Sequence, residues 1–233
     1  MKQFLFIIVF LFNSNSENNF AKIFGDDYQD AIMYFKTNKN IISKGLEQFD
    51  TPNSLIIPVL FPERIRYSLI RDLIETVSVE MIYVDFGSEY VDFSIGDFQL
   101  KPSFAENVEK NIRESTVLNT KYSKFLIYKN QEVKGKRKMR VKRLKSLNYQ
   151  LIYISAFYDI VSLKFNLNDK SKKEKIRFLS TCYNYGFTTT KLNIEKHIRD
   201  EYFPYGKIYK GKQYAYSEVS LYFYTNDYAL RTK

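Results

Sequence analysis

FSIGDFQLKPSFA, residues Phe93–Ala105, is the stretch in which residue types and their order together indicate a particular structure. Gly96 suits a tight turn, because glycine adopts a positive φ at little steric cost. Pro102 suits the first position of a helix, where a backbone N–H would have no partner inside the helix. The stretch therefore predicts a turn followed by a helix, with Gln99 between the two.

From Gly96 the stretch runs GDFQLKPSFA and resembles the GLMQIMPSTA segment of Slt-type lytic transglycosylases and goose-type lysozymes, which cut the glycan strands of peptidoglycan. The resemblance implies that Gly96 lets the backbone approach the sugar, that Gln99 reaches into the groove, and that Pro102 opens the next turn. Ser94, just upstream, is implied as a further substrate-binding residue.

A second match is CYNYGF, Cys182–Phe187, which is similar to the family motif AYNAGP. The resemblance implies that Tyr183 directs its hydroxyl to the catalytic glutamate and that Asn184 lies near the sugar-binding groove. A helix that ends in glycine explains Gly186 but not the Tyr-Asn pair. Tyr214–Tyr224 resembles the closing helix of the family, and its pattern is equally typical of an amphipathic or strand-like segment.

Glu63 is the candidate for the catalytic acid. Apolar residues from Ile65 to Val77 follow helical spacing and predict a core helix that starts at Pro62. A carboxylate in the first turn is ordinarily explained by the helix dipole. The preceding run LIIPVLFP is apolar, however, so we expect burial to raise the pKa of Glu63 and to keep a proton on it near neutral pH. Glu75 is the second candidate.

Other patterns predict a mainly α-helical protein. Phe20–Phe49 predicts a helix or a pair of helices after a start signal at Gly25, and Asp50–Asn53 marks a turn. Leu147–Phe165 is apolar all round, which predicts a buried helix. The interval between Glu63 and Gln99 is longer than in the common family pattern and predicts an inserted helix and loop around Glu75–Tyr90. Shorter helices are predicted at Phe104–Ile112, after Pro102, and at Ile176–Thr181.

The N-terminus, Met1–Phe12, reads MKQFLFIIVFLF and is too short to span a bilayer, which takes about 20 apolar residues. A lysine followed by such a run predicts an export signal, residues 1–19, with the nearest cleavage candidate at Asn13–Ser16. The length of 233 residues fits one domain, and the resemblance implies that residues 20–233 form a lysozyme-like catalytic domain, which we expect in the periplasm or cell envelope.

Composition limits the chemistry. One cysteine, Cys182, excludes an intramolecular disulfide, and one histidine, His197, excludes His-rich metal sites and is expected on the surface of a helix. We expect no metal site, no cofactor and a monomer.

The net charge of +10 predicts an anionic partner, and Lys134–Lys145 concentrates that charge. Such a run is typical of a solvated loop that leads into a helix. As a functional feature, it would hold anionic envelope polymers. A nucleic-acid partner is supported by charge alone, and the export signal argues against it.

The sequence thus predicts an exported lytic transglycosylase that binds peptidoglycan glycan strands and uses one catalytic glutamate. Hydrolysis would need a second acid to position water, for which Asp97 and Asp92 are the nearest candidates. The alternative is a non-catalytic envelope-binding protein with a lysozyme-like fold. Arg64 in place of the family serine and Phe187 in place of the family proline favour this alternative.

Two structural features distinguish these hypotheses. A burial-raised pKa of Glu63 beside Tyr183 would favour the enzyme. An ion pair from Glu63 to Arg64 or Arg66 would favour the binding protein.

Overall fold

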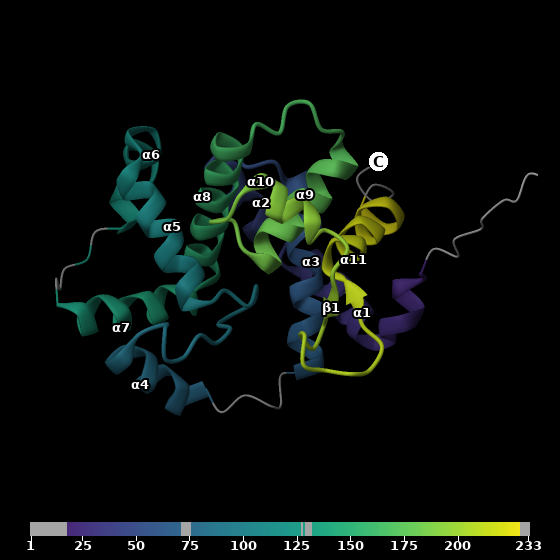
Figure 1. The fold of residues 1–233 in the computed structure, drawn as a ribbon, viewed down its shortest axis with the longest axis horizontal. Coiled ribbons are helices and arrows are strands. Elements are labelled where there is room, and N and C mark those ends of the chain that lie inside the picture. The colour runs from purple at the N-terminus through teal and green to yellow at the C-terminus, as the bar shows by residue number, and fades with distance from the viewer. Residues whose placement is uncertain (1–17, 71–75, 127, 129–131, 229–233) are drawn as a thin grey trace, which may run out of the picture.

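The computed structural model describes residues 18–70, 76–126, 128 and 132–228 (Figure 1). The predicted export signal up to residue 17, its cleavage region and Glu75 lie outside the described residues. None of the described helices is both long and apolar enough to cross a membrane.

The described residues form a mainly α-helical single domain, which confirms the predicted fold class at that level. Its helices are α1 (Phe20–Thr37), α2 (Lys39–Glu47), α3 (Asn53–Ile70), α4 (Thr76–Phe86), α5 (Pro102–Glu114), α6 (Thr116–Leu126), α7 (Val133–Leu144), α8 (Leu147–Phe165), α9 (Lys172–Tyr185), α10 (Lys191–Lys196) and α11 (Tyr216–Phe223). A short antiparallel hairpin pairs β1 (Glu201–Phe203) with β2 (Tyr214–Ala215), and a π-helical turn, Tyr224–Tyr228, follows α11.

The helices form two groups on either side of a central layer. In Figure 1, α4, α5, α6 and α7 lie on the left, α1, α11 and the hairpin lie on the right, and α3, α8 and α9 lie between them. The loop between α4 and α5 contains Phe93–Lys101 and contacts α3, where Arg64 donates to the carbonyl oxygen of Asp97 at 3.3 Å. The stretch Phe93–Ala105, which contains Gln99, therefore lies between the two groups of helices.

The helix α3 begins at Asn53, well before Pro62, so the prediction that it starts at Pro62 is wrong. Pro58 and Pro62 both lie inside the helix, where a proline costs about 3 kcal/mol. Tertiary packing outweighs this cost, because α3 contacts α1, α9 and α11 and buries most of its surface. Its fully buried side chains are Ile56, Val59, Leu60, Phe61 and Ile65. Glu63 therefore lies in the interior of a helix, where the helix dipole does not account for it.

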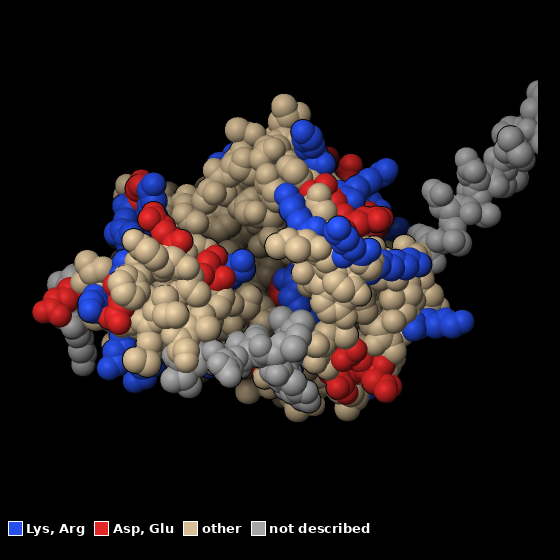
Figure 2. Space-filling view, turned by 60° about the horizontal axis from the view of Figure 1, so that its bottom comes forward, with Lys and Arg blue, Asp and Glu red and all other residues tan. Residues whose placement is uncertain are grey.

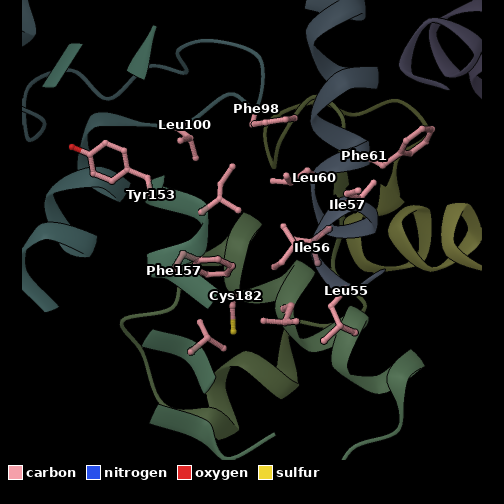
Figure 3. Close-up of a cluster of buried hydrophobic side chains, with 14 of the residues drawn as sticks. Leu55, Ile56, Ile57, Leu60, Phe61, Phe98, Leu100, Tyr153, Phe157 and Cys182 are labelled. Atoms are coloured by element: carbon pink, nitrogen blue, oxygen red, sulfur yellow. The ribbon is translucent and has the colours of Figure 1, made fainter. Parts of the chain in front are cut away.

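The core that supports the site joins α3, α8 and α9. Figure 3 shows Ile56 and Leu60 of α3 next to Phe157 of α8 and Cys182 of α9, all of which are buried. The helix α8 has the predicted bounds, Leu147–Phe165, and is the predicted buried helix. Cys182 packs in this core as a small apolar side chain.

Several local predictions are confirmed. The helix α5 begins at Pro102, α4 is the predicted inserted helix, and α1 and α2 are the predicted pair. Gly25, however, does not start a helix. It forms a kink inside α1, with φ 48°, and the helix begins earlier, at Phe20.

The basic segment Lys134–Lys145 is helical almost throughout, as α7, where a loop leading into a helix was predicted. Arg140 and Arg143 are buried, and Arg140 pairs with Glu106 and Glu109 of α5. Part of the charge of this segment therefore points into the protein and is not available to an external polymer.

Candidate active site

Five of the six predicted site residues line one pocket: Glu63, Ser94, Gln99, Tyr183 and Asn184. They come from α3, from the loop before α5, and from the end of α9. The pocket is narrow, with a volume of about 60 Å³, which leaves room for only a few water molecules. Glu63 and Gln99 therefore face the same small space.

Glu63 is the buried acid of this pocket, with 2% of its surface exposed. Burial is the largest influence on its pKa and raises it. The charge of Arg66 and hydrogen bonds from Tyr216 and Arg66 act in the opposite direction, but the pKa remains above its ordinary value. The predicted raised pKa is thus supported by the geometry of the pocket.

Tyr216 of α11 is a partner of Glu63 that the sequence did not reveal. Its hydroxyl group donates to the backbone carbonyl oxygen of Val59 at 2.8 Å and also lies in hydrogen-bonding reach of the Glu63 carboxyl. A hydroxyl group has one proton to donate and can accept as well. The Tyr216 hydroxyl group therefore lies between the Val59 carbonyl oxygen and the Glu63 carboxyl group, and its contact with Glu63 lowers the pKa of that carboxyl group.

Arg66 forms an ion pair with Glu63 across one turn of α3. Its Nη1 lies 2.9 Å and 3.0 Å from the two carboxylate oxygens. Its Nη2 donates to Asn184 at 3.1 Å, and its Nε donates to the carbonyl oxygen of Pro204 at 3.2 Å. Both discriminating features are thus present together: a raised pKa at Glu63 and an ion pair to it.

Arg64 does not reach Glu63, because adjacent residues of a helix face different directions. Its guanidinium group instead lies over the ring of Tyr34, 3.8 Å from the centroid, and pairs with Asp97 at 3.2 Å. The replacement of the family serine by Arg64 therefore leaves the pocket itself unfilled.

Tyr183 lies beside Glu63, but its hydroxyl group has another partner. It donates to the carbonyl oxygen of Phe98 at 2.7 Å, and its ring packs against Phe104 and Phe157. Burial and then the negative charge of Glu63 raise its pKa. Tyr183 thus fastens the loop that carries Gln99 to α9, and Tyr216 is the tyrosine that bonds the carboxyl group.

Gln99 presents an unused acceptor. Its backbone has φ 52°, and its Nε2 donates to the carbonyl oxygen of Gly96 at 2.8 Å. Its Oε1 is buried and has no hydrogen-bond partner among the residues that the structure describes. A buried acceptor without a partner costs about 1–3 kcal/mol, so this oxygen is suited to a donor group on a ligand.

Gly96 packs closely against neighbouring helices. Its φ of 74° lies in the left-handed region, and a Cβ there would lie 2.1 Å from Nε2 of Gln150 and 2.5 Å from the carbonyl oxygen of Leu144. Gly96 does not line the pocket. The glycine is needed for close packing of the turn against Gln150 of α8 and Leu144 of α7.

The two candidates for a second catalytic acid are engaged elsewhere. Asp97 pairs with Arg64, and Asp92 accepts hydrogen bonds from the backbone N–H of Ser103 at 3.0 Å and from its hydroxyl group at 2.7 Å. Asp92 therefore satisfies the first turn of α5. Among the described residues that line the pocket, Glu63 is the one carboxylate.

No metal-binding group of three or more His, Cys, Asp and Glu side chains occurs in the described part of the chain. His197 is half-buried directly after α10, where it stacks on Tyr185 and lies 2.6 Å from Asp200.

The raised pKa of Glu63 makes the stability of the fold depend on pH. The folded protein binds the Glu63 proton more tightly than the unfolded chain does, so the resulting stabilisation is complete below the unfolded pKa, about 4.3, and is lost as pH rises through the folded pKa. We expect the free energy of unfolding of the wild type to fall relative to that of Glu63→Gln as pH rises above about 4.3. Urea unfolding at a series of pH values measures it, and a pH-independent difference would contradict it.

Comparison with protein-family models, with curated proteins and with solved structures gives no match for this chain.

Proposed function

We propose that the protein is an exported, lysozyme-like lytic transglycosylase that cleaves the β-1,4 glycosidic bond between N-acetylmuramic acid and N-acetylglucosamine in peptidoglycan. The observation that carries the proposal is the buried carboxyl group of Glu63 in a polar pocket with Ser94, Gln99 and Asn184. These residue types occupy the positions at which the chain resembles that family.

In the proposed mechanism, protonated Glu63 donates its proton to the glycosidic oxygen, and an oxocarbenium-like state develops as the bond breaks. The Glu63 carboxylate then accepts the proton of the muramoyl C6 hydroxyl group, whose oxygen attacks C1 of the same sugar. The product is a 1,6-anhydro sugar, and Glu63 regains its proton. Gln99 accepts a hydrogen bond from the sugar through Oε1, and Ser94 and Asn184 supply further contacts.

Transglycosylation needs one carboxylate, which agrees with a pocket in which Glu63 is the one described acid. An inverting hydrolase would need a second carboxylate to activate water on the opposite face of the sugar. Asp92 and Asp97 are held by Ser103 and Arg64, so neither is free for that role. The occupied carboxylates therefore favour transglycosylation over hydrolysis.

In the proposed mechanism Arg66 leaves the pocket as the sugar enters, because Arg66 lines a pocket whose volume is only about 60 Å³. Its side chain is partly exposed, 19%. When Arg66 leaves, a charge that lowers the pKa of Glu63 is removed, so proton uptake by Glu63 accompanies the opening of the pocket. Substrate entry would thus produce the form of Glu63 that can act as an acid.

Arg66→Met removes this charge and keeps a side chain of similar length. We expect the pKa of Glu63 to rise further, so the upper pH limit of glycan cleavage should move upward by about one to three pH units. The pH profile of product release measures the shift. Arg64→Met is the matched control, because Arg64 pairs with Asp97, and it should leave the limit unchanged. An identical limit in Arg66→Met and wild type would be evidence against gating by Arg66.

Product analysis tests the proposed function. Purified protein is incubated with peptidoglycan, and the soluble products are identified by mass spectrometry. Anhydro-muropeptides are the expected products. Products with reducing ends would mean hydrolysis. If the folded protein releases no product, the proposal that it is an enzyme is rejected.

The second candidate is a non-catalytic envelope-binding protein, and the ion pair between Glu63 and Arg66 favours it. In that case the pair is a permanent structural contact, and the exposed cations of the molecule, including those of Lys134–Lys145, hold anionic envelope polymers. Sedimentation with peptidoglycan in the absence of any soluble product would identify this function.

A further inference from the structure

The tip of the β1–β2 hairpin, residues 204–213, combines exposed apolar and basic side chains in a way that the proposed function does not use. Ile208 is 94% exposed, and Tyr205 and Tyr209 are each about half exposed. Single exposed apolar residues are ordinary on a protein surface. Here, three of them lie within five positions, together with exposed lysines at 207, 210 and 212.

The tip is held in a defined shape by its own contacts. Gln213 connects its two sides: Nε2 donates to the carbonyl oxygens of Gly206 at 2.8 Å and Tyr209 at 3.1 Å, and Oε1 accepts from the backbone N–H of Tyr205 at 3.3 Å. The rings of Tyr205 and Tyr209 lie 4.6 Å apart. Ile208 is thus presented at the end of an ordered turn, so little conformational entropy remains to be lost on binding.

The charged side chains of the tip are all positive. Lys207, Lys210 and Lys212 form no ion pair within the described part of the chain, and residues 204–213 include no acid. The hairpin lies at the lower edge of Figure 1, and that edge comes forward in Figure 2, where blue Lys and Arg side chains stand on the right half of the face above a group of red Asp and Glu side chains. The tip is therefore electrostatically complementary to an anionic surface.

We propose that residues 204–213 dock the protein on a membrane that contains anionic phospholipids. Ile208 enters the boundary between headgroups and acyl chains, the two tyrosines lie at headgroup level, and the lysines contact phosphates. A polysaccharide would use the aromatic rings and the lysines, but it gives no reason for an almost fully exposed isoleucine at the end of the turn. A bilayer accounts for all three residue types.

Docking at this tip would hold the Glu63 pocket close to the membrane. Pro204, at the base of the tip, accepts a hydrogen bond from Arg66, and Phe203 lies 5.1 Å below the Arg66 guanidinium group. The binding itself does not depend on the proposed enzymatic function, and it is tested without peptidoglycan.

Vesicle sedimentation tests the proposal, with vesicles of phosphatidylcholine alone and with added phosphatidylglycerol. The full chain and a form that begins at Asn18 are both measured, because residues 1–17 carry an apolar run of their own. We expect both forms to bind the anionic vesicles and the shortened form to bind neutral vesicles much more weakly. Ile208→Ser should weaken anionic binding about tenfold. The triple variant Lys207→Gln, Lys210→Gln, Lys212→Gln should weaken it about fivefold per lysine.

Two controls make the result specific. The triple variant Lys173→Gln, Lys191→Gln, Lys196→Gln removes the same charge from exposed positions of α9 and α10 and should bind more tightly than the hairpin triple variant. Because the chain contains no tryptophan, Ile208→Trp supplies a single reporter, whose emission should shift to the blue on anionic vesicles.

Equal binding by Ile208→Ser and the wild type would overturn the proposal, as would vesicle binding that disappears when residues 1–17 are removed. Loss of binding to isolated glycan strands in the hairpin variants, with vesicle binding unchanged, would assign the tip to a polysaccharide and also reject membrane docking.

Discussion

Glu63→Gln is expected to lower the rate of glycan cleavage by about 10²–10⁴-fold, the range typical of a lost general acid. Glutamine keeps the shape of the side chain and can still accept a hydrogen bond from Arg66, but it has no proton of suitable acidity to give to the glycosidic oxygen. The rate of appearance of soluble anhydro-muropeptides measures the effect.

The control for this variant must separate chemistry from folding. Glu63→Gln should unfold at a urea concentration equal to or above that of the wild type near neutral pH, because burial of a charge at position 63 is avoided. Glu195→Gln, an exposed carboxylate of α10 that pairs with Lys170, is the matched change and should cleave at the wild-type rate. Full activity of folded Glu63→Gln would show that another residue is the acid.

Features with local causes could be predicted from the sequence. Pro102 marks the start of α5, and the apolar run Leu147–Phe165 gives α8, because turn chemistry and a continuous apolar pattern act within a few residues. The start of α3 could not be predicted in this way. Pro58 and Pro62 are local signals against a continuous helix, and contacts of α3 with distant helices outweigh them.

The candidate site also has features that could be predicted from the sequence and features that could not. Motif order brought Glu63, Gln99, Tyr183 and Asn184 into consideration, and the structure places them around one pocket. The partner of the Glu63 carboxyl group could not be assigned, because Tyr183 and Tyr216 are both plausible tyrosines and only three-dimensional packing decides between them. The ion pair between Glu63 and Arg66 could be predicted from the sequence as a possibility, since residues three apart share a helix face.

The basic segment shows why charge runs are poorly interpreted from sequence. Arg140 of α7 is buried and donates to Glu109 through Nε at 3.1 Å and Nη2 at 2.6 Å, and to Glu106 through Nη1 at 2.9 Å. Tyr153 and Tyr128 also donate to Glu109. Burial alone would raise the pKa of Glu109, but the hydrogen bonds and charge of Arg140 outweigh it and hold the pKa below its ordinary value. The carboxylates that make Arg140 structural come from another helix.

Arg140→Met should lower the free energy of unfolding by about 3–5 kcal/mol, because it leaves the buried carboxylate of Glu109 without its cation. Urea unfolding near neutral pH measures the loss. Lys134→Met is the matched control on the same helix: Lys134 pairs with Asp85 at 2.9 Å, but both side chains are exposed, so about 0–1 kcal/mol is expected. Equal losses for the two variants would contradict a structural role for Arg140.

Combining Arg140→Met with Glu109→Gln should restore part of the stability lost in Arg140→Met alone, because the unpaired buried charge is then absent. The pH dependence gives an independent check. In the wild type, the lowered pKa of Glu109 gives a stabilisation that is present above the unfolded pKa and is lost as pH falls through the folded pKa. Without Arg140 the pKa of Glu109 rises, so Glu109 becomes protonated and neutral as pH falls. The free energy of unfolding of the Arg140→Met single variant should therefore approach that of the double variant at low pH. A difference between these two variants that does not change with pH would mean that the cost of Arg140→Met lies in packing rather than in the charge of Glu109.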